Sequence, residues 1–277
     1  MMTRLWWTAT LVSLTAAVPS MAGSLPTVVP MLQTGYHQMY DLQFDRAHKT
    51  FAEWERQRPD DPLGHVSNAA AYLFAEFDRL NILQSEFFVN DDRFRHAKRL
   101  NPDLAVRRAF DAELAKAEEL ANGILARSPE DADALFANIL TMGLRADYQA
   151  LIEKRYMDSL RVIKSSRATA EKLLSISPNY YDAYLAIGVE NYMLSLKAAP
   201  VRWFLSLGGA QVDREKGIQD LRLTAEKGHY LSPYARLLLA VAALRNKDMA
   251  QARDLLGALV REFPHNQLYS EELARLQ

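Results

Sequence analysis

Residues 166–192 read SRATAEKLLSISPNYYDAYLAIGVENY, and this stretch contains the pattern that decides the fold. Ser166, Ala170 and Leu173 follow one another at steps of four and three, which places their side chains on one face of a helix. Pro178 then ends that helix, because proline lacks an N–H donor and clashes with the preceding turn. The stretch therefore predicts two helices joined by a short turn.

The same arrangement precedes three other prolines at the same offsets. A small residue comes first, an apolar or small residue follows four positions later, and a bulky apolar residue follows three after that. The small residue allows a neighbouring helix to approach closely. Four matched copies predict an internal helical repeat. The other three sets are Ala47, Phe51, Trp54 and Pro59; Ala117, Ala121, Ile124 and Pro129; and Ala252, Leu256, Leu259 and Pro264.

Polar residues follow the first three of these prolines, where their side chains can accept from the free N–H groups of a new helix. Runs of Ala, Leu, Glu, Arg and Lys, which are strong helix formers, dominate the chain. The sequence therefore predicts an all-α protein. The residues expected to open helices are Asp60, Glu130, Asp131 and Asn179.

These features resemble the tetratricopeptide repeat family. Its first helix carries an aromatic, a leucine, a glycine and a tyrosine, and its second ends in proline. The best copy of the first helix is Tyr184, Ile187, Gly188 and Tyr192, and Gly35 opens the first unit in the same register. The resemblance implies a right-handed solenoid of helical hairpins, formed as one domain by residues 23–277.

Several segments depart from the family pattern. Irregular insertions are expected near residues 78–102 and 197–212. Asp147 to Ile176 is expected as one long helix, because the spacing there exceeds a repeat. Asp213 is expected to cap a helix that ends at Gly228, and residues 270–277 are expected as a short closing helix, which solenoids need at their ends.

The N-terminus has the three-part layout of a secretory signal peptide. A single positive charge at Arg4 precedes the apolar run Leu5–Ala17, and small residues Ser20 and Ala22 follow. We expect cleavage near Ala22, so that residues 1–22 are removed. The mature chain is expected in a periplasm or outside the cell, without a transmembrane span.

The sequence offers little for catalysis or cofactors. It has no cysteine, which excludes thiolate catalysis and cysteine-bound metals. It has no His-Glu-x-x-His, phosphate loop or nucleophile elbow, and Gly208-Gly209 lacks the context of a dinucleotide site. His37 and Asp41 are four apart but are more simply surface helix residues. We therefore expect a non-enzyme with no metal or cofactor.

Residues 93–99 form a basic stretch with aromatic neighbours, a combination that can bind nucleic acid. The net charge of the whole chain is −1, and export is expected, so we expect no nucleic-acid partner. The carboxylates Asp91 and Asp92 belong to a solvated loop in this interpretation, since calcium needs more oxygen ligands. The basic residues are Arg93, Arg95, His96, Lys98 and Arg99.

If the register is that of the family, the first helices line a concave groove, and its side chains are mostly apolar. The insertions could fill this groove, or it could bind an apolar partner; filling is favoured, since large exposed apolar patches are uncommon. The leading hypothesis is a protein-binding scaffold or adaptor, possibly in envelope assembly. A helical carrier of a hydrophobic small molecule or lipid is the alternative, and an enzyme is the least favoured. The groove residues are Tyr36, Tyr40, Leu73, Phe74, Phe136, Leu185 and Tyr192.

Overall fold

The computed structural model describes residues 29–83, 100–195 and 213–276, with the side chains of 193–195 excepted. Over these ranges the chain is all-helical, with eleven α-helices and no strand. The prediction of an all-α fold is therefore confirmed. None of the described helices is long and apolar enough to cross a bilayer.

Several sequence predictions lie outside the described residues. They are the signal peptide at 1–22, the insertion at 197–212, the larger part of the insertion near 78–102, the Asp91–Asp92 pair and the basic stretch that follows it.

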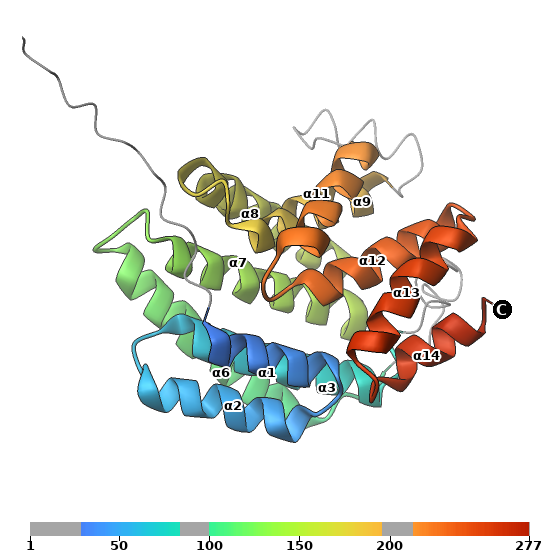
Figure 1. The fold of residues 1–277 in the computed structure, drawn as a ribbon. Helices are drawn as coiled ribbons and strands as arrows, with labels where there is room; N and C mark the ends of the chain where they lie inside the picture. Colours follow the sequence, from blue (N-terminus) through green and yellow to red (C-terminus); the bar gives the residue numbers. More distant parts are fainter. Residues whose placement is uncertain (1–28, 84–99, 196–212, 277) are drawn as a thin grey trace, which may run out of the picture.

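Helices that follow one another in the sequence pack side by side (Figure 1). Within the described residues they form five consecutive pairs, α1 with α2, α3 with α6, α7 with α8, α9 with α11 and α12 with α13, and α14 packs on α13. The helices are α1 (Pro30–Tyr40), α2 (Phe44–Gln57), α3 (Pro62–Arg79), α6 (Leu104–Leu125), α7 (Ala132–Asp147), α8 (Tyr156–Ile176), α9 (Tyr184–Ser195), α11 (Arg214–Lys227), α12 (Ser232–Arg245), α13 (Met249–Glu262) and α14 (Gln267–Ala274).

The repeated pattern forms the contact face of the second helix in each of its four copies. The first two positions of every set are buried, while Trp54 and Ile124 at the third position are half-buried. Helices α2, α8 and α13 end two residues before their prolines, and α6 ends four before Pro129. The predicted helix faces and helix ends are therefore confirmed.

Two glycines of the repeat pattern, Gly35 and Gly188, lie at close contacts between helices. A Cβ at Gly35 would overlap the ring of Phe51, within the first helix pair. A Cβ at Gly188 would lie 3.0 Å from the carbonyl oxygen of Gly217 and 3.0 Å from the backbone N of Leu221. Helices α9 and α11 therefore touch backbone to backbone, which a larger side chain would prevent.

The predicted helix caps are partly wrong. Asp61 and not Asp60 caps α3, because its Oδ1 accepts from the backbone N–H of Leu63 while its Oδ2 accepts from Trp54 Nε1. Asp131 caps α7 as predicted, through Ala134 N–H. Asn179 caps no helix, since a 3₁₀ turn, Tyr181–Ala183, comes first and leads into α9.

The predictions for the segments that depart from the repeat have different outcomes. Asp213 caps α11 and Gly228 ends it, as predicted. The expected long helix from Asp147 to Ile176 is wrong, because a π-helical turn, Tyr148–Ile152, follows α7 and the chain breaks before α8. Lys154 at this break has a φ of 60°, in the left-handed region that ends helices. The closing helix begins earlier than predicted, at Gln267, because Asn266 caps it.

The first and last parts of the chain meet, as Figure 1 shows for α1, α13 and α14. The backbone N–H of His265 donates to Asp41 Oδ1 at 2.9 Å, and Asn266 Nδ2 donates to the carbonyl of Tyr40 at 2.7 Å. The ring of Phe263 packs 5.9 Å from that of Tyr40. We call these contacts, between residues 37–43 and 263–269, the seam. The seam closes the succession of hairpins on itself.

Candidate functional site

The residues predicted to line the concave groove lie largely inside the protein. Six of the seven are buried, and Leu185 is half-buried. Tyr192, at the end of α9, packs with Leu221 of α11 and Leu239 of α12. The remaining five, Tyr36, Tyr40, Leu73, Phe74 and Phe136, belong to the main core.

The loop between α11 and α12 occupies the space beside α1 and α7. Its Tyr230 ring lies 5.3 Å from Tyr36 and 6.3 Å from Phe136, centre to centre, and its hydroxyl accepts from the backbone N–H of Val29. The backbone N–H groups of residues 229–231 all donate to Asp182. Within the described residues, the inner surface is therefore filled by residues 229–234, and the expected filling by the insertions concerns segments that lie largely outside them.

A half-buried carboxylate, Asp147, also lies between α7 and α12. The hydroxyl of Tyr234 donates to Asp147 Oδ2 at 3.3 Å, and Tyr234 packs edge-on against Phe74. Burial raises the pKa of Asp147 to about 7. Such a perturbed carboxyl is a common mark of a functional site, yet among the described residues the side chain that hydrogen-bonds to it is a tyrosine. We therefore interpret the pair as a half-buried cross-link of the fold.

A pocket of about 280 Å³ opens beside the seam. Its apolar wall comes from α1, α3 and α14 and includes Phe74, Phe77 and Leu268. Two exposed carboxylates, Asp78 and Glu271, are also among its lining residues. The pocket thus combines an apolar wall with negative charge. The other lining residues are Met39, Tyr40, Leu42, Asn81, Leu83, His265, Asn266, Gln267 and Tyr269.

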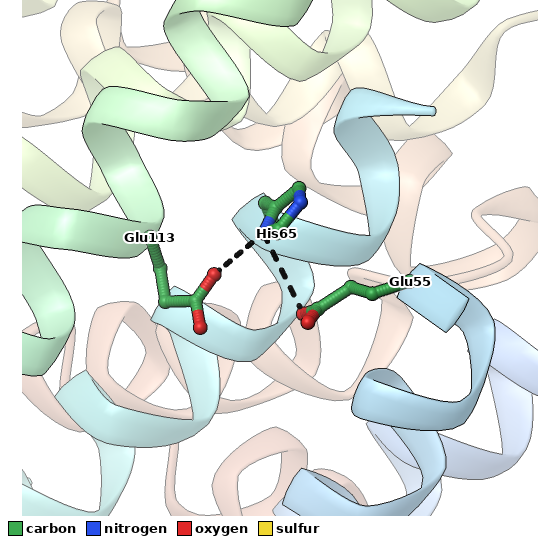
Figure 2. A group of neighbouring side chains, drawn as sticks. All are labelled: Glu55, His65 and Glu113. Atoms are coloured by element: carbon green, nitrogen blue, oxygen red, sulfur yellow. Dashed lines mark hydrogen bonds and ion pairs between the residues drawn. The ribbon is translucent and has the colours of Figure 1, made fainter. Parts of the chain in front are cut away.

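A second polar group lies where α2, α3 and α6 meet, and we call Glu55, His65, Asn68 and Glu113 the His65 cluster. Figure 2 shows His65 between the two carboxylates, each from a different helix. His65 Nδ1 is 2.7 Å from Glu113 Oε2 and 3.8 Å from Glu55 Oε1. The three side chains are 17–20% exposed, so solvent and small ions reach them.

The arrangement of the His65 cluster is fixed by its neighbours. Asn68 Nδ2 donates to both carboxylates, at 3.1 Å to Glu55 and 3.0 Å to Glu113. His48 Nδ1 lies 2.6 Å from Asn68 Oδ1, which orients the amide. Burial and the nearby charge of Glu113 raise the pKa of Glu55, and the hydrogen bond to Glu113 raises the pKa of His65.

The interpretation of His37 and Asp41 as surface helix residues is wrong for Asp41. His37 is exposed on α1 and packs against the ring of Phe263, whereas Asp41 follows α1, is buried and accepts a hydrogen bond from the backbone N–H of His265. Burial alone would raise the pKa of Asp41, but the hydrogen bonds from His265 and Gln43 outweigh it and lower the pKa. Asp41 is therefore an ionised hydrogen-bond acceptor at the seam.

Sequence reasoning missed both the His65 cluster and the seam pocket. Glu55 and His65 are ten positions apart, and Glu113 follows 48 positions later, so no local motif joins them. The sequence could have shown only the polar side of α3. His65 and Asn68 are three residues apart and therefore project from the same side of that helix. No protein-family model matches the chain, and no curated protein matches it.

Proposed function

We propose that this chain is an exported, non-catalytic protein of tetratricopeptide type that binds a partner protein. The fourfold repeat pattern and the succession of helix pairs support the fold part of this proposal. Helical repeats of this kind commonly present extended binding surfaces. A fold alone is weak evidence for function, so the binding site has to be identified from the chemistry of the surface residues.

The seam pocket carries the proposal. The inner surface is filled by residues 229–234, so a partner cannot lie along it without displacing Tyr230. The pocket combines an apolar wall with Asp78 and Glu271. This chemistry suits a protein segment that inserts one apolar side chain and places a basic residue against the carboxylates.

Site-specific crosslinking tests this directly. A photoreactive p-benzoylphenylalanine at Leu268, which lines the pocket, should crosslink one discrete partner in the native envelope. The same group at Met157, an exposed residue on α8, serves as the matched control. Equal crosslinking from both positions, or none from Leu268, would contradict binding at the pocket.

Charge reversal then tests the expected partner chemistry. The pair Asp78→Lys and Glu271→Lys should abolish the Leu268 crosslink, because it would repel the basic residue. Glu119→Lys on α6 changes an exposed charge away from the pocket and should leave the crosslink intact. A crosslink that survives the double reversal would contradict a basic partner.

The size of the pocket favours a second candidate, a carrier of a small hydrophobic molecule. Small-molecule sites enclose about 300–1,000 Å³, and the seam pocket of about 280 Å³ lies near the lower end of that range. Native mass spectrometry separates the two functions. A carrier should retain a molecule of defined mass that Phe74→Trp displaces, whereas the protein-binding form should have the mass of the chain alone.

Export is part of the same proposal. The N-terminal sequence of the mature protein should begin at Gly23, after removal of residues 1–22. Mature protein that begins at Met1 in the cytosolic fraction would contradict it.

A further inference from the structure

We propose that Glu55, His65 and Glu113 bind a zinc ion on the outer side of the α2–α3–α6 junction. The site is independent of the seam pocket and does not depend on the proposed partner. Among the described residues, these three form the one group of His and carboxylate side chains that could hold a metal ion, with ligand atoms that all lie within 4.8 Å of one another.

The distances fit one shared ion. Zinc binds histidine nitrogen and carboxylate oxygen at about 2.0–2.2 Å in tetrahedral geometry, so ligand atoms stand about 3.4 Å apart. The His65 nitrogen lies 2.7 Å from the Glu113 oxygen and 3.8 Å from the Glu55 oxygen, which brackets that separation. Small side-chain rotations are enough to reach it, and Figure 2 shows the ring nitrogen directed at both carboxylates.

The surrounding side chains hold the ligands as the supporting groups of a metal site do. Asn68 donates to both carboxylates, and His48 lies in hydrogen-bonding distance of Asn68. Such partners orient ligands before an ion arrives. Gly64 contributes space, since a Cβ there would lie 3.0 Å from the Cγ of Glu55.

The charge of the group also favours a cation. Two carboxylates share the half-buried site and repel each other. A divalent cation would relieve this repulsion more fully than one imidazolium. The other polar groups near the ligands are His48, Tyr72 and Lys116, of which Lys116 is a cation.

The mixed ligand set selects the ion. Imidazole nitrogen suits zinc and other transition metals, whereas calcium and magnesium prefer oxygen ligands and more of them. With three protein ligands the fourth position would belong to water, as in open zinc sites.

Isothermal titration of the full mature chain with zinc chloride, after chelator treatment, tests the site. We expect saturable one-to-one binding that millimolar magnesium or calcium does not compete away. His65→Gln should abolish it while keeping a donor to Glu113, and Glu113→Gln should also abolish it. Asn68→Ala should weaken the affinity by about 10–100-fold, the usual effect of losing a supporting partner.

Two controls keep the result decisive. Glu119→Gln, on the same helix as Glu113 but outside the cluster, should bind zinc like the unaltered protein. Circular dichroism of each variant at the titration temperature shows whether it is folded, and cobalt(II) absorption of the unaltered chain reports tetrahedral coordination without any variant. Absence of binding to the unaltered chain, or equal binding by folded His65→Gln, would overturn the zinc site and leave His65 and Glu113 as an ion pair.

Discussion

The contacts within a hairpin and the contacts at the seam are built from different chemistry. Within hairpins, small residues such as Ala47 and Gly188 let helices meet closely around buried apolar side chains. At the seam, by contrast, Asp41 holds the loop at His265 through hydrogen bonds, and Asn266 binds a backbone carbonyl. The hairpins therefore depend on shape and apolar burial, while closure of the chain depends largely on polar groups and on pH.

The largest expected effect breaks a hairpin. Phe51→Ala removes a fully buried ring that packs on Gly35 and Tyr36, and it should lower the free energy of unfolding by about 3–5 kcal/mol. Urea denaturation followed by circular dichroism measures this. Phe51→Leu, which keeps much of the volume, should cost clearly less. If Phe51→Ala lowered the free energy of unfolding by less than a typical substitution of an exposed residue does, the close packing of α1 on α2 would be contradicted.

The second effect comes from the interior contact between α7 and α12. Burial raises the pKa of Asp147 to about 7, so the folded state favours the protonated acid. The stabilisation from that proton is complete below the unfolded pKa near 4 and is lost as pH rises through 7. Asp147→Asn should therefore stabilise the protein by roughly 1–3 kcal/mol at pH 8, given about 1.4 kcal/mol per pKa unit.

Urea denaturation of both proteins from pH 4 to pH 8 checks this prediction. The advantage of Asp147→Asn should grow with pH and should be smallest at pH 4. An advantage that is independent of pH would mean that Asp147 titrates as an ordinary carboxyl.

A third change overpacks the backbone contact between α9 and α11. Gly188→Ala places a methyl group against Gly217 and Leu221 and should cost about 1–3 kcal/mol. Gly143→Ala is the matched control, because nothing lies near its Cβ position within α7. That control should stabilise the helix by up to about 1 kcal/mol. Thermal unfolding distinguishes the two, and equal shifts would contradict the close contact.

The smallest expected effect loosens the seam alone. The pKa of Asp41 is lowered, so its stabilisation is present above the unfolded pKa near 4 and is lost as pH falls through the folded pKa. Asp41→Asn should cost on the order of 1–2 kcal/mol at pH 7, since hydrogen bonds to charged groups exceed neutral ones. The difference from the unaltered protein should disappear in acid. A cost that persists at low pH would point to packing instead of charge.

The difference between the two kinds of contact also explains what the sequence could predict. The hairpin faces repeat at offsets of four and three, so Ala170 and Leu173 could be placed on a buried face from the letters alone. The seam joins residues more than 200 positions apart, and no sequence pattern in either segment predicts that the two segments are in contact. The assignment of Tyr36 to the concave groove followed from the repeat register. Its neighbour Tyr230 could not be anticipated, because it depends on where the α11–α12 loop folds back.

The His65 cluster follows the same rule. Its members come from three helices, and each by itself reads as a surface side chain. Only α3 brings two of them, His65 and Asn68, together by local spacing. The sequence therefore shows that α3 has a polar face. It does not show which side chains of other helices lie against that face.

The central claim is that the chain closes on itself at the seam, and thiol crosslinking with a short bismaleimide tests it most directly. The chain has no cysteine, so Gln43→Cys with His265→Cys creates a unique pair at positions whose native side chains approach within 3.3 Å at their tips. We predict that a bismaleimide joins the two cysteines within one folded chain and that urea suppresses this crosslink. Gln43→Cys with Met157→Cys should form none. If the Gln43 and His265 pair reacted no faster than that control, the chain would be an open stack of hairpins and the account of its closure would be wrong.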